Sequence, residues 1–263
     1  MWAGLACLGV ALLAALLSLV WTPYPADALD LPNRLAGPSA AHWLGTDPFG
    51  RDVASRLLEG AGNALWIGAL AVAIGVVVGG ALGLLAAAAG RWLDESISRA
   101  ADLLFAFPAV LSAILLAVWL GPGAFTATLA IGIFNVPVFA RLVRSAAGVV
   151  WQTEFARAAE ALGKERWRIT LDHVLPNVAG LVLVQASASF AIAILAEAAL
   201  SYLGLGTQAP HASWGRMLFE ARTYLDQAPT LAIFPGLAIA LVVFGANLVG
   251  DALRDALDPR ANP

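Results

Sequence analysis

The chain has 263 residues, of which 60% are hydrophobic and only 13% are charged, and its mean hydropathy is +0.79. This composition lies far outside the range of soluble globular domains and predicts a polytopic membrane protein. The formal net charge is -3 and the basic residues form no continuous stripe, which argues against nucleic-acid binding. The one cysteine excludes a disulfide framework, and the three scattered histidines nominate no metal site.

A bilayer core of about 30 Å needs about 20 mostly apolar helical residues, and six stretches of the chain meet this requirement. The first lacks the basic region of a secretory signal and exceeds the usual apolar length of about 7 to 15 residues, so we expect it to remain as an anchor. We therefore predict an all-α fold with a single transmembrane domain over residues 1–263. The expected spans are 2–21, 64–89, 101–120, 124–143, 179–200 and 231–249.

The Lys and Arg residues between the spans predict the orientation. If both termini are cytoplasmic, ten of these residues lie inside and five outside. Because cytoplasmic loops carry the excess of Lys and Arg, we expect both termini and the segment 154–176 on the cytoplasmic side.

Small residues and prolines mark particular faces of the spans. Gly75, Gly79 and Gly83 recur every four residues, so they line one helix face that should pack closely against a neighbouring helix. Pro108 and Pro137 remove backbone donors and predict kinks. These kinks fit either a role in gating or simple shape-fitting within a bundle.

Three charged residues on the outer side are candidates for a functional role. For Arg51 and Asp52, in the first outer loop, the default interpretation is a local ion pair in a turn, and the alternative is a docking contact. Glu197 is expected near the outer end of the fifth span. It either accepts hydrogen bonds from Ser201 or Tyr202, or lines the outer mouth of a pathway.

The segment 154–176, EFARAAEALGKERWRITLDHVLP, is a long charged insert between two apolar stretches. Its first half is rich in alanine, and Glu154 sits where the helix dipole favours an anion, so we predict a short helix that Gly163 ends or bends. Ala158 and Ala159 would let another protein approach the backbone closely. A surface helix without a partner remains the alternative.

Other residues of this segment have expected structural roles. Glu160 and Lys164 have the spacing of a stabilising helical ion pair. Trp167, Ile169 and Leu171 are expected to seat the segment against the bundle, and the residue Pro176 to begin the next span.

Motifs for catalysis are missing from the sequence. Gly163 and Lys164 are followed by Glu165, so the pair does not form a phosphate-binding loop, and neither a nucleophile elbow nor a zinc-protease motif occurs. The spans are almost free of ionisable residues, which argues against a proton-coupled carrier. We therefore expect a membrane protein without enzymatic activity of its own.

Four segments carry a resemblance to a known family. The Ala158-Ala159 and Gly163 pattern resembles the EAA loop of ABC importer permeases, although Arg157 stands in place of the Glu that gives this loop its name. The other three resemble the C-type subunit of the dipeptide, oligopeptide and nickel branch, although Val136 stands before Pro137 where a Trp is frequent. They are 42–56 (HWLGTDPFGRDVASR), 196–206 (AEAALSYLGLG) and 247–260 (NLVGDALRDALDPR).

The resemblance implies a type I importer permease fold in a bacterial inner membrane, where the chain shares a pathway with a second permease. One or two cytoplasmic ATPases would bind ATP and Mg, so this chain needs no cofactor, and a solute-binding protein would deliver the substrate. Dipeptides, oligopeptides, nickel chelates and other small solutes stay open as substrates, and a stand-alone carrier or channel is the alternative function. The expected ATPase-coupling residues are Glu154, Ala158, Ala159, Glu160, Gly163 and Lys164.

Overall fold

The computed structural model describes residues 2–257, and every regular element within them is helical, as the sequence predicts. The last residues of the segment 247–260 lie outside the described part. They include Arg260, one of the ten basic residues expected on the cytoplasmic side. In chain order the elements are α1 (Trp2–Val20), η1 (Leu31–Asn33), α2 (Val53–Ile74), η2 (Gly75–Gly79), α3 (Gly80–Ala88), α4 (Arg91–Ala106), α5 (Ala109–Leu120), α6 (Ala124–Trp151), α7 (Glu154–Ala161), α8 (Arg166–Ile169), η3 (Thr170–Val174), α9 (Leu175–Tyr202), α10 (Trp214–Ala221) and α11 (Thr230–Leu257).

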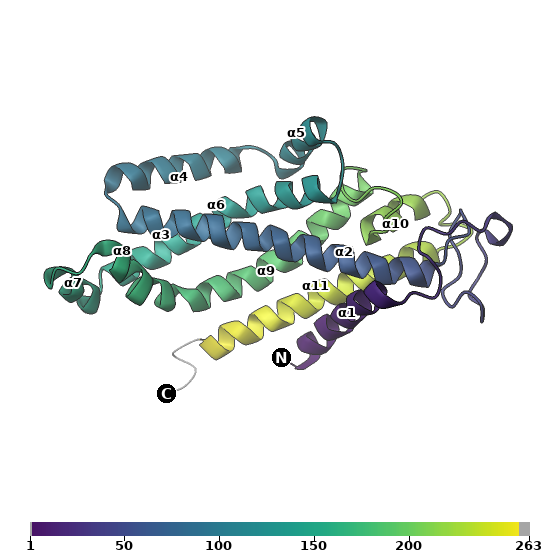
Figure 1. Ribbon diagram of the computed structural model, residues 1–263, viewed down its shortest axis with the longest axis horizontal. Coiled ribbons are helices and arrows are strands. Elements are labelled where there is room, and N and C mark those ends of the chain that lie inside the picture. The colour runs from purple at the N-terminus through teal and green to yellow at the C-terminus, as the bar shows by residue number, and fades with distance from the viewer. Residues whose placement is uncertain (1, 258–263) are drawn as a thin grey trace.

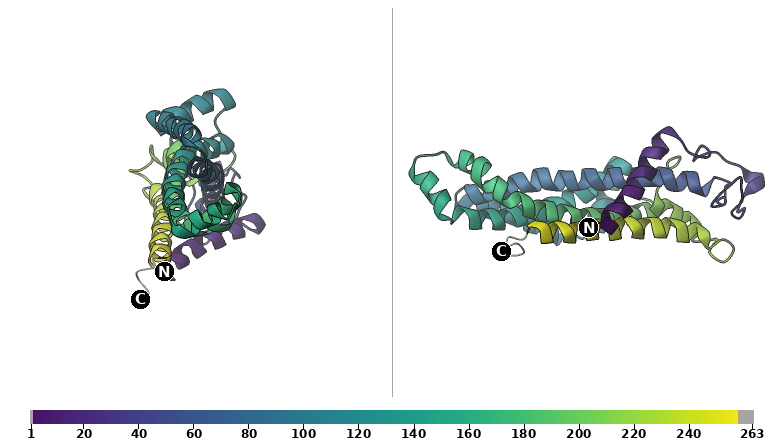
Figure 2. Two further views of the ribbon diagram at one scale, coloured as in Figure 1. Left: turned by 90° about the vertical axis from the view of Figure 1, so that its left-hand side faces the viewer. Right: turned by 90° about the horizontal axis from the view of Figure 1, so that it is seen from below.

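The helices form an elongated bundle. The long helices α2, α6, α9 and α11 run along its main axis, with α7 at one end and α10 and the first long loop at the other (Figure 1). We call these the α7 end and the α10 end. Helix α1 packs on α2 and α11 and crosses them at a slant (Figure 2).

Five of the described helices are long and apolar enough to cross a membrane, or six if the bent pair α4 and α5 counts as one span. The expected straight span 101–120 is therefore wrong, because α4 and α5 meet at 87°. The break lies at Pro108, which has no N–H and forces the preceding Phe107 into an extended conformation with φ -88° and ψ 128°. By contrast, α6 continues as a helix through Pro137.

Several helices extend beyond the expected spans. The second span begins at Val53 rather than at residue 64 and continues to Ala88 through the π-helical turn η2. Helices α6 and α11 likewise run on to Trp151 and Leu257. Apolar run length underestimated these helices because polar and charged residues, such as Arg56 and Glu59 of α2, interrupt the apolar run near their ends.

The second half of the segment 154–176 is largely helical. A continuous helix runs from Arg166 through η3 and α9 to Tyr202, and Pro176 lies in the first turn of α9. The π-helical turn Thr170–Val174 directly precedes this proline. A wider turn here accommodates a residue that cannot donate to the helical ladder.

The glycine face of the second span packs against α6, which confirms the close approach predicted from the sequence. A Cβ atom added to Gly79 would lie 2.3 Å from the carbonyl oxygen of Val136, and one added to Gly83 would lie 2.6 Å from that of Ala140. Both distances are far below van der Waals contact with backbone atoms that cannot move aside. The absence of side chains on this face therefore sets the separation of the two helices.

This packing makes a direct prediction. Gly79→Ala should destabilise the protein by about 1–3 kcal/mol, because overpacking forces α6 away from the second span. The matched control is Gly80→Ala, where an added Cβ meets open space, and a small stabilisation of about 0.4–1 kcal/mol is expected. Thermal unfolding of both variants in one detergent measures the difference. Equal melting temperatures would contradict the packing argument.

Candidate functional site

At the α7 end, the short helix α7 ends in a glycine turn. Leu162 follows the last helical residue, and Gly163 adopts the left-handed conformation with φ +79°. The N–H of Lys164 donates to the carbonyl of Ala159 at 3.1 Å, and the N–H of Gly163 donates to that of Glu160 at 3.0 Å. This pair of bonds is a Schellman motif, and the helix end predicted at Gly163 is confirmed.

The ion pairs around this turn differ from the prediction. Lys164 contacts Asp172 at 2.9 Å and His173 at 3.1 Å, while Glu160 pairs with Arg166 at 3.5 Å. The predicted helical pair between Glu160 and Lys164 is wrong, because Lys164 lies beyond the left-handed residue and no longer follows the helical spacing. These contacts instead connect the turn to the start of the next helix.

One side of α7 packs on the bundle and another side carries apolar groups into solvent. Ala156 is buried, and Ala159 packs against the cluster formed by α6 and the Arg166–Tyr202 helix. Phe155, Ala158 and Leu162 are exposed, with Leu162 at 87%. They follow the spacing i, i+3 and i+7 of one helix face. The exposed positions of Phe155 and Leu162 were not predicted, although their helical spacing is visible in the sequence.

The residues expected to seat the segment only partly do so. Ile169 is fully buried against α6, but Trp167 and Leu171 are exposed, so their expected role is wrong. The actual support includes Trp151, whose ring lies 4.7 Å beneath the Arg166 guanidinium. Glu154 occupies the first turn of α7 and is exposed, as expected.

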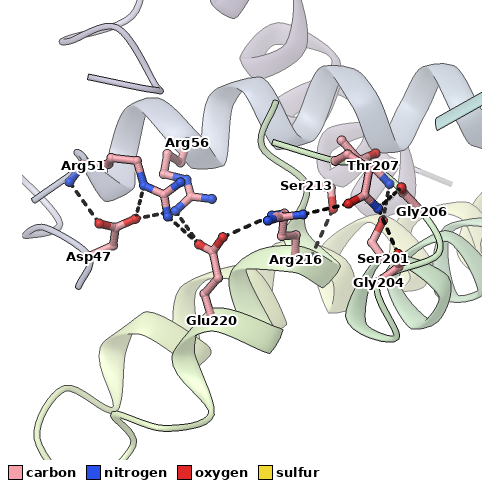
Figure 3. Close-up of polar contacts among 11 residues, drawn as sticks. Asp47, Arg51, Arg56, Ser201, Gly204, Gly206, Thr207, Ser213, Arg216 and Glu220 are labelled. Atoms are coloured by element: carbon pink, nitrogen blue, oxygen red, sulfur yellow. Dashed lines mark hydrogen bonds and ion pairs between the residues drawn. The ribbon is translucent and has the colours of Figure 1, made fainter. Parts of the chain in front are cut away.

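At the α10 end, three arginines and two carboxylates form a buried network (Figure 3). Asp47 accepts hydrogen bonds from Arg56 and, at 2.6 Å, from Arg51. Glu220 accepts from Arg51 at 2.6 Å, from Arg56 at 2.7 Å and from Arg216 at 3.1 Å. The network therefore fastens the first long loop and α2 to α10.

Arg51 and Asp52 do not form the local pair expected from the sequence. Asp52 caps α2 instead, accepting bonds from the N–H and the hydroxyl of Ser55, both at 2.8 Å, and lying 2.9 Å from His42. Both Arg51 and Asp52 are buried. Adjacent residues on an extended segment point to different partners, so sequence proximity did not indicate pairing.

The arginines change the ionisation of Glu220. Burial by itself raises the pKa of this carboxyl, but the attraction and hydrogen bond of Arg56, with the charges of Arg51 and Arg216, outweigh burial. The pKa of Glu220 therefore lies below its ordinary value of 4.5. Glu220 is charged at neutral pH and stabilises the network.

Glu197 lies beside this network, on α9, and is 1% exposed. It accepts a hydrogen bond from Ser201 at 2.7 Å, and the Ser201 oxygen accepts one from the N–H of Thr207 at 3.0 Å. The hydrogen bond expected from Ser201 is confirmed, whereas Tyr202 is exposed and is not a partner. Glu197 therefore anchors the turn that follows α9.

A third feature is a cavity of about 240 Å³ between α5, α6 and α9. Most of its lining is apolar, and Glu197 does not contribute to it. Its three polar side chains are Asn135, Gln185 and Ser189, each near the middle of a long helix. These two amides and this hydroxyl were not predicted, because only ionisable residues within the spans were taken as functional candidates.

Next to the cavity, two ion pairs join α4 to α6. Arg144 contacts Asp94 at 2.8 Å, and Arg141 contacts Asp102. Arg141 also lies 4.3 Å over the Phe105 ring, which in turn contacts Phe134 of α6 edge-on. These charges are partly exposed and lie within or beside the expected spans, so this face is more polar than was inferred from the sequence.

Across residues 2–257, groups of three or more His, Cys, Asp or Glu side chains that could hold a metal are not found.

A bundle of long apolar helices, with a short helix displayed at one end and a cavity between helices, defines a membrane transport subunit. Residues 79–263 match the model of the binding-protein-dependent transport system inner membrane component, and the chain belongs to this family. It is a membrane-spanning permease subunit of a bacterial ABC importer. Such an importer also contains a partner permease, ATPases and a binding protein.

The similar proteins agree with this assignment. The chain is 49% identical over 87% of its length to the dipeptide transport system permease protein DppC of Alkalihalophilus pseudofirmus, covering 75% of that protein. It is 44% identical over 90% of its length to the glutathione transport system permease protein GsiD of Pectobacterium atrosepticum, covering 79% of that chain. It is 41% identical over 96% of its length to the probable D,D-dipeptide permease DdpC of Escherichia coli K12, covering 86% of it.

A solved structure shares the fold. The inward-facing MetNI methionine ABC transporter contains a chain that superposes with a TM-score of 0.65 at 18% identity, over 76% of this chain and 95% of that one. The type I importer permease fold inferred from the sequence is thereby confirmed. Membership in this family also rules against the stand-alone carrier considered as the alternative.

The buried network yields a prediction with a pH dependence. Glu220→Gln should destabilise the solubilised protein by about 3–5 kcal/mol at pH 7, because buried arginines lose a charged partner. Because the pKa of Glu220 in the folded protein lies below 4.5, its contribution is complete above about pH 4.5 and is lost as the pH falls through the lowered value. The melting-temperature difference between wild type and variant should therefore shrink at low pH.

The control for this variant is Glu95→Gln, which removes the exposed ion pair with Arg99 on α4. An exposed pair contributes about 0–1 kcal/mol, so little change is expected. A Glu220→Gln protein that melts like the Glu95→Gln protein at pH 7 would contradict the stabilising role of the network.

Proposed function

We propose that this chain forms, with a second homologous permease, the membrane pathway for short peptides in an importer driven by one or two cytoplasmic ATPases. The relatives described above are named for dipeptides, for D,D-dipeptides and for glutathione, which are all small peptides. Their similarity supports the substrate class. An extracytoplasmic binding protein would deliver the peptide to the α10 end.

We further propose that α7 is the element that contacts an ATPase. The observation that carries this proposal is the exposed apolar face of Phe155, Ala158 and Leu162. The opposite side of the helix packs on the bundle through Ala156 and Ala159, and its end is fixed by the glycine turn. An amphipathic helix that presents anchors at this spacing suits a groove on a partner protein. Among the expected coupling residues, Glu154, Glu160 and Lys164 would border this contact and Ala159 would support it from below.

This arrangement requires the α7 end to be cytoplasmic. The excess of Lys and Arg on that side supports this orientation, with both termini cytoplasmic and the whole chain acting as one permease domain in the inner membrane. ATP and Mg would be bound by the ATPases, and the chain itself would neither hydrolyse ATP nor carry a cofactor.

The glycine turn provides the test of coupling. Gly163→Asp should abolish most peptide uptake while leaving membrane insertion intact, because a side chain at φ +79° strains the turn and a carboxylate enters the contact face. Gly163→Asn separates the two effects, since Asn tolerates the left-handed conformation and adds no charge. It should retain more uptake than Gly163→Asp.

The matched control is Gly90→Asp, in the turn between α3 and α4 at the same end of the bundle. Gly90 has φ -70° and an open surrounding, and it precedes α4 as its N-cap, a position where Asp is favoured. Uptake of a labelled dipeptide by cells expressing each variant, with membrane levels measured in parallel, decides the matter. Normal uptake with Gly163→Asp would argue against α7 as the coupling element.

A further inference from the structure

The cavity between α5, α6 and α9 has free hydrogen-bonding atoms of a specific kind. The amide nitrogen of Asn135 donates to the carbonyl of Ile131 at 3.1 Å, and that of Gln185 donates to the Ser189 hydroxyl oxygen at 3.2 Å. These bonds use one of the two N–H donors of each amide. In the described part of the chain, the amide oxygens of Asn135 and Gln185 are left as acceptors, and the Ser189 hydroxyl keeps its proton to donate.

The position of Asn135 is built into the packing of the bundle. A Cβ atom on Gly75 would lie 2.5 Å from the Cβ of Asn135. Only glycine at the start of the π-helical turn η2 leaves room for Asn135 at this point. Single π-helical turns within α-helices often occur at functional sites, and this one lies directly behind the cavity wall.

The charges beside the cavity indicate that this face of the bundle meets water rather than lipid. Arg141 of α6 and Asp102 of α4 are half or more exposed. Exposed charged side chains are expensive against lipid tails and face water or another protein instead. Phe105 and Phe134 connect these charges to the cavity, because Phe134 is part of its lining.

The cavity is too small to be a complete small-molecule site by itself. Its volume of about 240 Å³ is below the roughly 300–1,000 Å³ of complete small-molecule sites. In a heteromeric importer a second permease would supply the opposite wall. The lining contains three polar side chains and none with a charge.

We propose that Asn135, Gln185 and Ser189 form a recognition site for the peptide bond of the transported solute, with the two amide oxygens as acceptors for its N–H and the Ser189 hydroxyl as donor to its carbonyl. This inference rests on the proposed function and deepens it. The site contacts the uncharged backbone and leaves the charged termini of a peptide to water or the partner wall. It holds the solute weakly, as release from a transport pathway requires.

The test uses the assembled importer and the reactivity of an introduced thiol. In a Cys7→Ser background, Ser189→Cys should react with a small cationic thiol reagent, and L-alanyl-L-alanine supplied with binding protein and ATP should slow this reaction. Loss of one or two neutral hydrogen bonds corresponds to about a 3- to 10-fold change. Adding Gln185→Leu should therefore weaken the protection by about 3- to 10-fold.

Two control positions define what the reagent reports. Ser96→Cys lies on the exposed face of α4 and should react at one rate with and without the dipeptide. Leu237→Cys lies on the exposed apolar side of α11 and should resist a charged reagent, as expected beside lipid.

The outcomes separate this inference from the proposed function. In one outcome the unmodified importer takes up the dipeptide but the thiol of Ser189→Cys is unreactive, because the partner permease or lipid fills the cavity. In another the thiol reacts but the dipeptide does not protect it. Either result would contradict the proposed recognition site. In that case the proposed function stands. If the unmodified importer does not take up the dipeptide at all, the proposed substrate class and the recognition site both fall.

Discussion

The close approach of α6 to the glycine face of the second span is the constraint on which much of the bundle depends. Because backbone atoms of α6 lie where side chains of Gly79 and Gly83 would be, the two helices can pack this closely in the observed register only with glycine at these positions. That register places Asn135 in the cavity wall and brings Arg141 and Arg144 beneath the carboxylates of α4. In a membrane, such small-residue contacts replace the hydrophobic driving force that water would provide.

The α10 end is organised by polar contacts that connect distant parts of the chain. Asp47 and Glu220 share the arginines of the first loop and α2, and Arg216 continues the network at 3.3 Å to Gln208. Gln208 in turn donates to the carbonyls of Gly204 and Gly206 in the turn after α9 (Figure 3). The α10 end is thus fixed by buried charge, whereas the α7 end presents a small helix whose apolar groups are uncovered. This contrast suits a rigid α10 end and an α7 end that is open to a partner protein.

The sequence predicted those features that depend on local chemistry. Helix spans followed from apolar length, the glycine face from its period, and the end of α7 from Gly163. It did not predict the ionic network, because Arg56 and Glu220 are separated by most of the chain, nor α10, which is too short for an apolar-span criterion. The Glu160–Lys164 pair failed since the left-handed turn lies between its members. The π-helical turn Thr170–Val174, which joins α8 to α9 in one continuous helix, was also not predicted.

The candidate sites divide in the same way. The proposed coupling segment was predicted from its charge and from its alanine and glycine pattern, but its exposed face became visible only once Ala156 was seen to be buried. Asn135, Gln185 and Ser189 converge from two helices, and a one-dimensional pattern contains no information about such convergence. Arg51 and Asp52 illustrate the converse, because neighbours in sequence have separate partners in space.

The central claim is that the exposed face of α7 contacts an ATPase, and cross-linking tests it most directly. Since Cys7 is the one cysteine, a Cys7→Ser protein with Leu162→Cys can carry a single photoreactive group at the 87%-exposed position. Irradiation in native membranes should yield an adduct between this chain and an ATP-binding subunit, identified by mass spectrometry. An adduct with lipid or with the partner permease alone, in membranes that contain the assembled importer, would contradict the account.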